Sequence, residues 1–197
     1  MTPGPDRVVP LRFDLSALVR RSVATFYSHL VTRPTGQALR IGIESQIIEL
    51  RGLCLSILDF SQVAVLDYSC ADETIAKLLQ RSQQPDRPAE AYFIARGVAE
   101  RHREAIEEVL ARHGLALVAE MVGAGPALLG AATAEERTTW TALEVLSRAP
   151  AGAVATRARR DESETARSLD RLVERRVVLR HGSPATYYAL SALVREG

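Results

Sequence analysis

Short apolar runs alternate with segments of helical periodicity in the middle of the chain, and this alternation constrains the fold more than any other feature. The apolar runs lie at 53–58, 91–95 and 115–119, and each has the length of a buried strand. The segments between them, 69–82 and 97–113, place their apolar residues on one helical face. This order predicts an α/β sandwich whose sheet has at least three strands and is partly parallel.

The segment 36–51 fits two kinds of secondary structure. Apolar residues recur at helical spacing from Leu39 to Leu50, but Leu39, Ile41 and Ile43 also alternate as they would in a strand. We favour the helix. Further upstream, apolar residues alternate from Val9 to Leu15, so residues 7–35 predict one or two edge strands and a short helix.

Small residues replace the periodic patterns over 123–132. We interpret this stretch as a linker between a unit at 7–122 and a second unit at 133–197. Cleavage of such a linker by limited proteolysis is expected to release two fragments that stay folded.

The second unit predicts three helices and a β-hairpin. Thr133 and Glu136 have the spacing of a capping box before the first helix, and Asp161 and Glu164 repeat that spacing before the third. A short second helix is expected over 152–158. Two short strands are expected over 177–180 and 186–190, on either side of the turn HGSP. Three helices and a hairpin are typical of a winged helix-turn-helix.

Charge and composition exclude several classes of function. With 25 basic and 24 acidic residues the formal net charge is +1, so nucleic-acid binding would need a local patch. Cys54 and Cys70 lack the spacing of a disulfide framework or a metal site, and no phosphate-binding glycine motif is present. The sequence therefore predicts no metal, no cofactor and no enzymatic activity. Without a signal peptide or a membrane-spanning apolar run, it predicts a cytoplasmic protein without membrane contact.

The run LDFSQVAVLDYSCADE at 58–73 is similar to the signature of STAS domains, which occur in anti-sigma-factor antagonists and sulphate-transporter tails. Together with TRPTG at 32–36, it most resembles the STAS-like variant of bacterial regulatory proteins. The resemblance covers roughly residues 7–120. It implies a small sheet-and-helix domain that a serine kinase of the histidine-kinase-like fold phosphorylates at one serine.

In antagonists that serine lies in an Asp-Ser-Ser-Gly pattern at a helix N-terminus. Asp67 matches the aspartate of the pattern and Ser69 its second serine, whereas Tyr68 and Cys70 depart from it. Ser69 is therefore the candidate phosphorylation site. The alternative is that Ser69 only caps a helix that begins at Cys70.

The run SLDRLVERRVVLR at 168–180 resembles the recognition helix and wing of MarR-type and related winged-helix regulators. DNA contact in such proteins requires basic side chains on the exposed helix face and at the wing. The candidate DNA-binding residues are Arg157, Arg159, Arg160, Arg167, Arg171 and Arg180. Residues 133–197 hold 11 arginines and 9 acids, a net charge of only +2, so protein contact or dimerisation is the alternative use of this unit.

The order of the two units favours a bacterial cytoplasmic transcriptional regulator. In this hypothesis the STAS-like unit receives a signal or docks a histidine-kinase-like serine kinase or another regulatory protein, and the winged helix binds promoter DNA. The alternative is a partner-switching adaptor, similar to an anti-sigma-factor antagonist, that does not bind DNA. The sequence leaves the oligomeric state open, including a homodimer, because no residue pattern identifies an interface.

Overall fold

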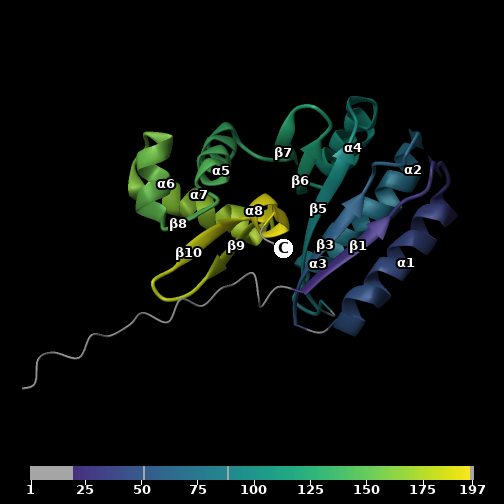
Figure 1. The fold of residues 1–197 in the computed structure, drawn as a ribbon, viewed down its shortest axis with the longest axis horizontal. Coiled ribbons are helices and arrows are strands. Elements are labelled where there is room, and N and C mark those ends of the chain that lie inside the picture. The colour runs from purple at the N-terminus through teal and green to yellow at the C-terminus, as the bar shows by residue number, and fades with distance from the viewer. Residues whose placement is uncertain (1–19, 51, 88, 196–197) are drawn as a thin grey trace, which may run out of the picture.

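A five-stranded sheet lies at the centre of the computed structural model, which describes residues 20–50, 52–87 and 89–195 (Figure 1). The strands are β1 (Arg20–Thr25), β3 (Leu53–Asp59), β5 (Glu90–Val98), β6 (Ala116–Met121) and β7 (Gly125–Gly130), in the spatial order β1-β3-β5-β6-β7. β1, β3, β5 and β6 are parallel, and β7 pairs antiparallel with β6. The predicted α/β class and the three predicted strands are confirmed.

Helices cover one face of this sheet. They are α1 (Arg33–Leu50), a continuous run of α2 (Tyr68–Ala71), η2 (Asp72–Ala76) and α3 (Lys77–Gln83), and α4 (Glu100–Arg112). The short strands β2 (His29–Leu30) and β4 (Val65–Leu66) form a separate parallel pair. The structure therefore confirms the helical interpretation of 36–50. It also confirms an edge strand before α1, whereas the alternation from Val9 to Leu15 lies outside the described residues.

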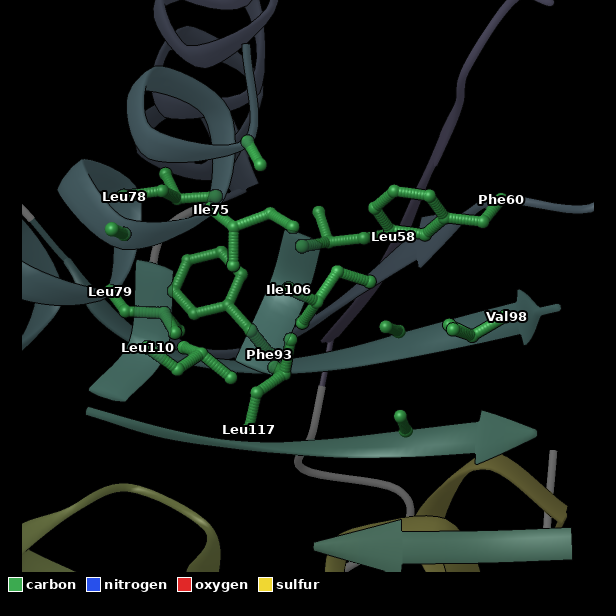
Figure 2. Close-up of a cluster of buried hydrophobic side chains, with 14 of the residues drawn as sticks. Leu58, Phe60, Ile75, Leu78, Leu79, Phe93, Val98, Ile106, Leu110 and Leu117 are labelled. Atoms are coloured by element: carbon green, nitrogen blue, oxygen red, sulfur yellow. The ribbon is translucent and has the colours of Figure 1, made fainter. Parts of the chain in front are cut away.

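The central strands are buried on both faces, so their side chains divide between two cores. On the helix side, alternate residues of β3, β5 and β6 pack against apolar residues of the helices. Figure 2 shows the ring of Phe93 pointing from β5 towards the helices, among Ile75, Leu79 and Leu110. This burial explains why these strands read as continuous apolar runs rather than as alternating patterns.

Residues 133–195, which we call the C-terminal unit, form the three predicted helices, a fourth short helix that was not predicted, and a small antiparallel sheet. The elements are α5 (Ala134–Leu146), β8 (Arg148–Ala149), α6 (Ala151–Ala158), α7 (Glu162–Glu174), β9 (Val178–His181), β10 (Thr186–Ala189) and α8 (Leu190–Arg195). The strand order is β8-β10-β9. The capping box of Thr133 and Glu136 is present, and the Asp161 carboxylate accepts from the Glu164 amide at the start of α7.

The expected linker at 123–132 is corrected by the structure, because residues 125–130 form β7. Gly123 (φ 78°) and Gly125 (φ 81°) occupy the left-handed region, which lets the chain reverse after β6. Leu128 and Leu129 are then buried as β7 pairs with β6. The small residues of this segment therefore mark a tight hairpin within the sheet.

The C-terminal unit packs on the face of the sheet opposite α1 and α4. One continuous core joins Leu55, Ile57, Tyr92, Ile94 and Val118 of the sheet to Trp140, Leu143, Leu169 and Leu190 of the C-terminal unit. Arginines add polar contacts across this boundary. The Arg176 guanidinium donates to the Ala91 carbonyl (3.0 Å) and lies 5.1 Å from the centre of the Tyr92 ring, and Arg21 donates to the Leu193 carbonyl. The two predicted units therefore share a core.

Candidate functional site

α7 and its neighbours contain all six predicted DNA-binding arginines. Asp161 ends the loop after α6 and caps α7, which fixes where the helix begins. Thr165, Ser168, Leu169 and Leu172 point inward. The opposite face, which we call the outward face of α7, carries Ser163, Arg167, Asp170 and Glu174. α7 follows α6 closely and packs against it, and the β9–β10 hairpin lies beside it (Figure 1).

Three of the six arginines are held in ion pairs. Arg160 contacts Glu135 (3.2 Å) and Glu164 (3.3 Å), and hydrogen bonds to these carboxylates raise the pKa of its guanidinium above the ordinary value. Arg180 contacts the Asp170 carboxylate at 3.1 Å.

Arg171 has a structural partner. Its Nε donates to Glu136 Oε1 at 2.9 Å, and Glu136 is only 1% exposed. Because a buried carboxylate without a cation is costly, Arg171 is bound to α5 rather than free for a ligand. Arg167 and Arg171 are four residues apart, as predicted, but Arg171 turns towards α5 while Arg167 stays on the outward face.

Arg157, Arg159 and Arg167 are exposed, and none makes an ion pair or a side-chain hydrogen bond within the described part of the chain. Arg157 lies in α6, and Arg159 ends that helix in the left-handed conformation (φ 55°). These three guanidinium groups are therefore available to a phosphate or a base edge without first breaking an internal contact.

The acids around α7 are partly neutralised. Arg160 pairs with Glu164, and both Arg180 and the Tyr187 hydroxyl contact Asp170. Burial, followed by this hydrogen bond to Asp170, raises the pKa of Tyr187 above its ordinary value. The paired arginines thus reduce the repulsion that the acidic first turn would exert on a phosphate backbone.

Ser69 lies at the start of α2, but Asp67 is the residue that caps this helix. Asp67 Oδ1 accepts from the Cys70 amide at 2.8 Å, and the Ser69 hydroxyl donates to the same oxygen at 2.9 Å. The helix begins at Tyr68, so the prediction that Ser69 caps a helix starting at Cys70 is wrong. Ser69 is half-buried, and its phosphorylation stays a prediction.

Sequence reasoning missed a cluster of charges at the π-helical turn η2. Glu73, 4% exposed, contacts Arg33 (2.7 Å) and Lys77, and Asp72 contacts Arg33 (3.4 Å) and His113 (2.7 Å). Burial disfavours the charged form of both acids. This effect of burial is outweighed by hydrogen bonds, which lower both pKa values. Lys77 and Arg33 donate to Glu73, and His113 donates to Asp72. The cluster ties α1, η2 and the end of α4 together.

The described residues contain no group of three or more histidines, cysteines or acids that could hold a metal ion. Cys54 and Cys70 are free and buried. No helix among the described residues is long and apolar enough to cross a membrane. In comparisons with known proteins, no family model, no curated protein and no solved structure matches the chain.

Proposed function

We propose that the protein is a bacterial cytoplasmic transcriptional regulator. Residues 133–195 act in it as a winged helix-turn-helix that binds DNA. The preceding residues act as a STAS-like unit that receives a signal or a regulatory protein. α7 is the recognition helix and the β9–β10 hairpin is the wing.

The observation that carries this proposal is the order of elements in the C-terminal unit. A helix, a strand, two further helices and a hairpin follow one another, and the sheet order is β8-β10-β9. This arrangement supports α7, which follows α6, as the helix that enters a major groove. Its outward face carries Arg167, the side chain with the reach to contact a guanine edge.

The free arginines divide by position into two roles. Arg167 on the outward face of α7 serves base recognition. Arg157 and Arg159 at the end of α6 serve phosphate contact, which sets affinity and its salt dependence. The other three arginines contribute indirectly, because each forms an ion pair with an acid on or beside the recognition helix. They are Arg160, Arg171 and Arg180.

The test is fluorescence anisotropy with a labelled duplex from the upstream region of the gene, against a scrambled duplex of equal length. Arg167→Ala should weaken binding to the upstream duplex by about 1–3 kcal/mol and reduce the preference over the scrambled one. Arg157→Ala and Arg159→Ala should weaken binding to both duplexes and each reduce the salt slope by about 1. Arg112→Ala, an exposed arginine on α4, is the matched control.

Equal affinities of Arg167→Ala and Arg112→Ala would overturn α7 as the recognition helix. The runner-up function, a partner-switching adaptor, is favoured by the half-exposed Ser69 at a helix start and by the acids Asp170 and Glu174 on the outward face of α7. Absence of binding to either duplex at low salt, together with phosphate on Ser69 in protein from the native host, would favour the adaptor.

A further inference from the structure

A stripe of apolar and small side chains runs along the solvent face of α1, beside the exposed polar residues Arg33, Gln37, Gln46 and Glu49. Five exposed residues of this helix are separated by four, three, four and three positions: Pro34, Ala38, Ile41, Ser45 and Ile48. We call this set the α1 stripe. Such spacing produces a straight seam on a helix, the pattern by which one helix packs against another. Ile41 and Ile48 are 50% and 49% exposed, so the described chain leaves about half of each residue uncovered.

A solvated helix of the same molecule has a different surface. The exposed positions of α4 are charged at every place except Ala111: Glu100, Arg101, Arg103, Glu104, Glu108 and Arg112. The α1 stripe contains no charged residue over more than four turns, and the exposed charged residues of this helix, Arg33 and Glu49, lie at its two ends. Charge depletion with apolar enrichment distinguishes the core of an interface from ordinary surface.

Gly42, next to the stripe, gives a second and independent indication. A glycine inside a helix costs about 1 kcal/mol relative to alanine, so it needs a reason. Gly36 of the same helix has one, because a Cβ there would lie 2.7 Å from the Cys70 carbonyl oxygen. A Cβ at Gly42 would meet nothing within 4 Å in this chain. Close approach by another helix would explain why a glycine occupies position 42.

We propose that the α1 stripe is a homodimer interface, in which α1 packs antiparallel against α1 of a second copy across a two-fold axis near Ile43. This register places each isoleucine against a small residue: Ile41 against Ser45 of the second copy, and Ile48 against Ala38. Antiparallel packing also opposes the two helix dipoles favourably. A stripe in which large and small side chains alternate is complementary to a second copy of itself, and a two-fold interface requires such self-complementarity.

The contact continues beyond the helix. An open groove beside the stripe is lined by Val23 and Tyr27 of the β1 edge and by Ala38 and Gly42 of α1. Val23 and Tyr27 are both exposed. An 18-residue helix is about 27 Å long and about 10 Å across, so α1 alone offers less area than the roughly 800 Å² per partner of a standard interface. The groove adds to this area, and a weak dimer that depends on protein concentration is expected.

α1 and the α6–α7 pair lie at opposite ends of the molecule (Figure 1). Dimerisation through α1 therefore leaves α7 free in both copies. Dimerisation through α1 does not require DNA binding by the C-terminal unit, so an experiment can contradict one of the two without contradicting the other.

Sedimentation equilibrium of the full chain over a wide range of concentration tests the interface. Wild type should shift from monomer to dimer, and Ile41→Glu should weaken the dimer by at least about tenfold because each copy would bury a carboxylate without a partner. Val145→Glu, which changes an exposed apolar residue of α5, is the matched control and should dimerise like wild type. Gly42→Ala should raise the melting temperature of the monomer and weaken the dimer.

Cysteine cross-linking tests the register. Cys54 and Cys70 are buried, so introduced cysteines should react first. A mixture of Ile41→Cys and Ser45→Cys chains should form disulfide dimers faster than either variant alone. A wild type that stays monomeric, an Ile41→Glu dimer of unchanged affinity, or equal cross-linking in all three samples would overturn the proposal. Dimerisation only after removal of residues 1–19 would also overturn it, because that segment would then occupy the face.

Discussion

Glu73 shows how single residues hold the helical layer together. Its carboxylate is almost fully buried, and Arg33 and Lys77 contact one oxygen while Arg40 lies 3.9 Å from the other. A carboxylate in that position without cations would be strongly unfavourable. The ion pairs therefore offset a desolvation cost, and the geometry of η2 depends on keeping them intact.

The Glu73 pairs should make stability depend on pH in the acid range. The folded-state pKa of Glu73 lies below its ordinary value of 4.5, so its contribution is present above pH 4.5 and is lost as the pH falls through the folded-state pKa. Glu73→Gln should cost about 2 kcal/mol at neutral pH. In denaturant titrations, this difference from wild type should shrink below pH 4.5. A difference that stays constant or grows there would contradict the assignment.

Arg167 and Arg171 should behave differently although both lie on α7. Arg171→Ala removes the closest cation from the buried Glu136 and should cost about 3 kcal/mol of stability. Arg167→Ala removes an exposed side chain without an internal partner and should change stability by less than about 0.5 kcal/mol. Urea unfolding of both variants checks this. Equal stabilities would mean that Arg171 is as free as Arg167.

At the scale of elements, the sequence predicts what local patterns determine. β3, β5 and β6 are continuous apolar runs, α4 has a clear apolar face, and Thr133 with Glu136 forms the predicted capping box. The sequence of β7 resembles a linker because its small residues carry little periodic pattern, and pairing with β6 makes this segment a strand. The π-helical turn at η2 has no local signature, since distant Arg33 and His113 surround it.

The same distinction applies to the candidate site. The Arg160–Glu164 pair follows from four-residue spacing on or beside a helix, so it could be anticipated from the sequence. The Arg171–Glu136 and Arg176–Glu90 pairs join residues far apart in the chain, so it could not be predicted which arginines stay free. The number of arginines in a segment therefore overestimates how many of them are free to contact a ligand.

The contact between α1 and η2 should be sensitive to one methyl group. A Cβ at Gly36 would lie 2.8 Å from Glu73 Cβ as well as close to the backbone of α2, so Gly36→Ala should cost about 1–3 kcal/mol. Gly42→Ala in the same helix, measured on the monomer, should instead gain up to about 1 kcal/mol. Thermal unfolding at low protein concentration shows whether each variant is less or more stable than wild type. Stabilisation by both variants would contradict the close packing of α1 on η2.

At the scale of the whole molecule, the central sheet serves two cores. Ile57, Ile94 and Val118 face the C-terminal unit, while their neighbours Leu58, Phe93 and Leu117 face the helices. Arg176 reinforces the boundary by contacting Glu90 and Tyr92 of β5. A change in the sheet can therefore reach the end of α7 through packed side chains, without a hinge between separate domains.

The shared core should make unfolding a single transition. Trp140, the only tryptophan, is buried in the core between sheet and C-terminal unit, so its fluorescence reports that boundary. Fluorescence and far-UV circular dichroism should give coincident denaturant midpoints. Ile94→Ala should lower both midpoints together, at a cost of about 2–5 kcal/mol. Separate transitions, or release of two stable fragments by proteolysis within 123–132, would contradict a shared core.

Photo-cross-linking can show whether α7 and the β9–β10 hairpin contact DNA. A duplex that carries bromodeoxyuridine throughout is irradiated with the full chain, and cross-linked peptides are identified by mass spectrometry. Cross-links are expected within residues 157–187, in α6, α7 and the β9–β10 hairpin, and should be lost when salt is raised. Cross-links confined to α1 or α4, or none above the level of an unrelated protein, would contradict contact between these elements and DNA.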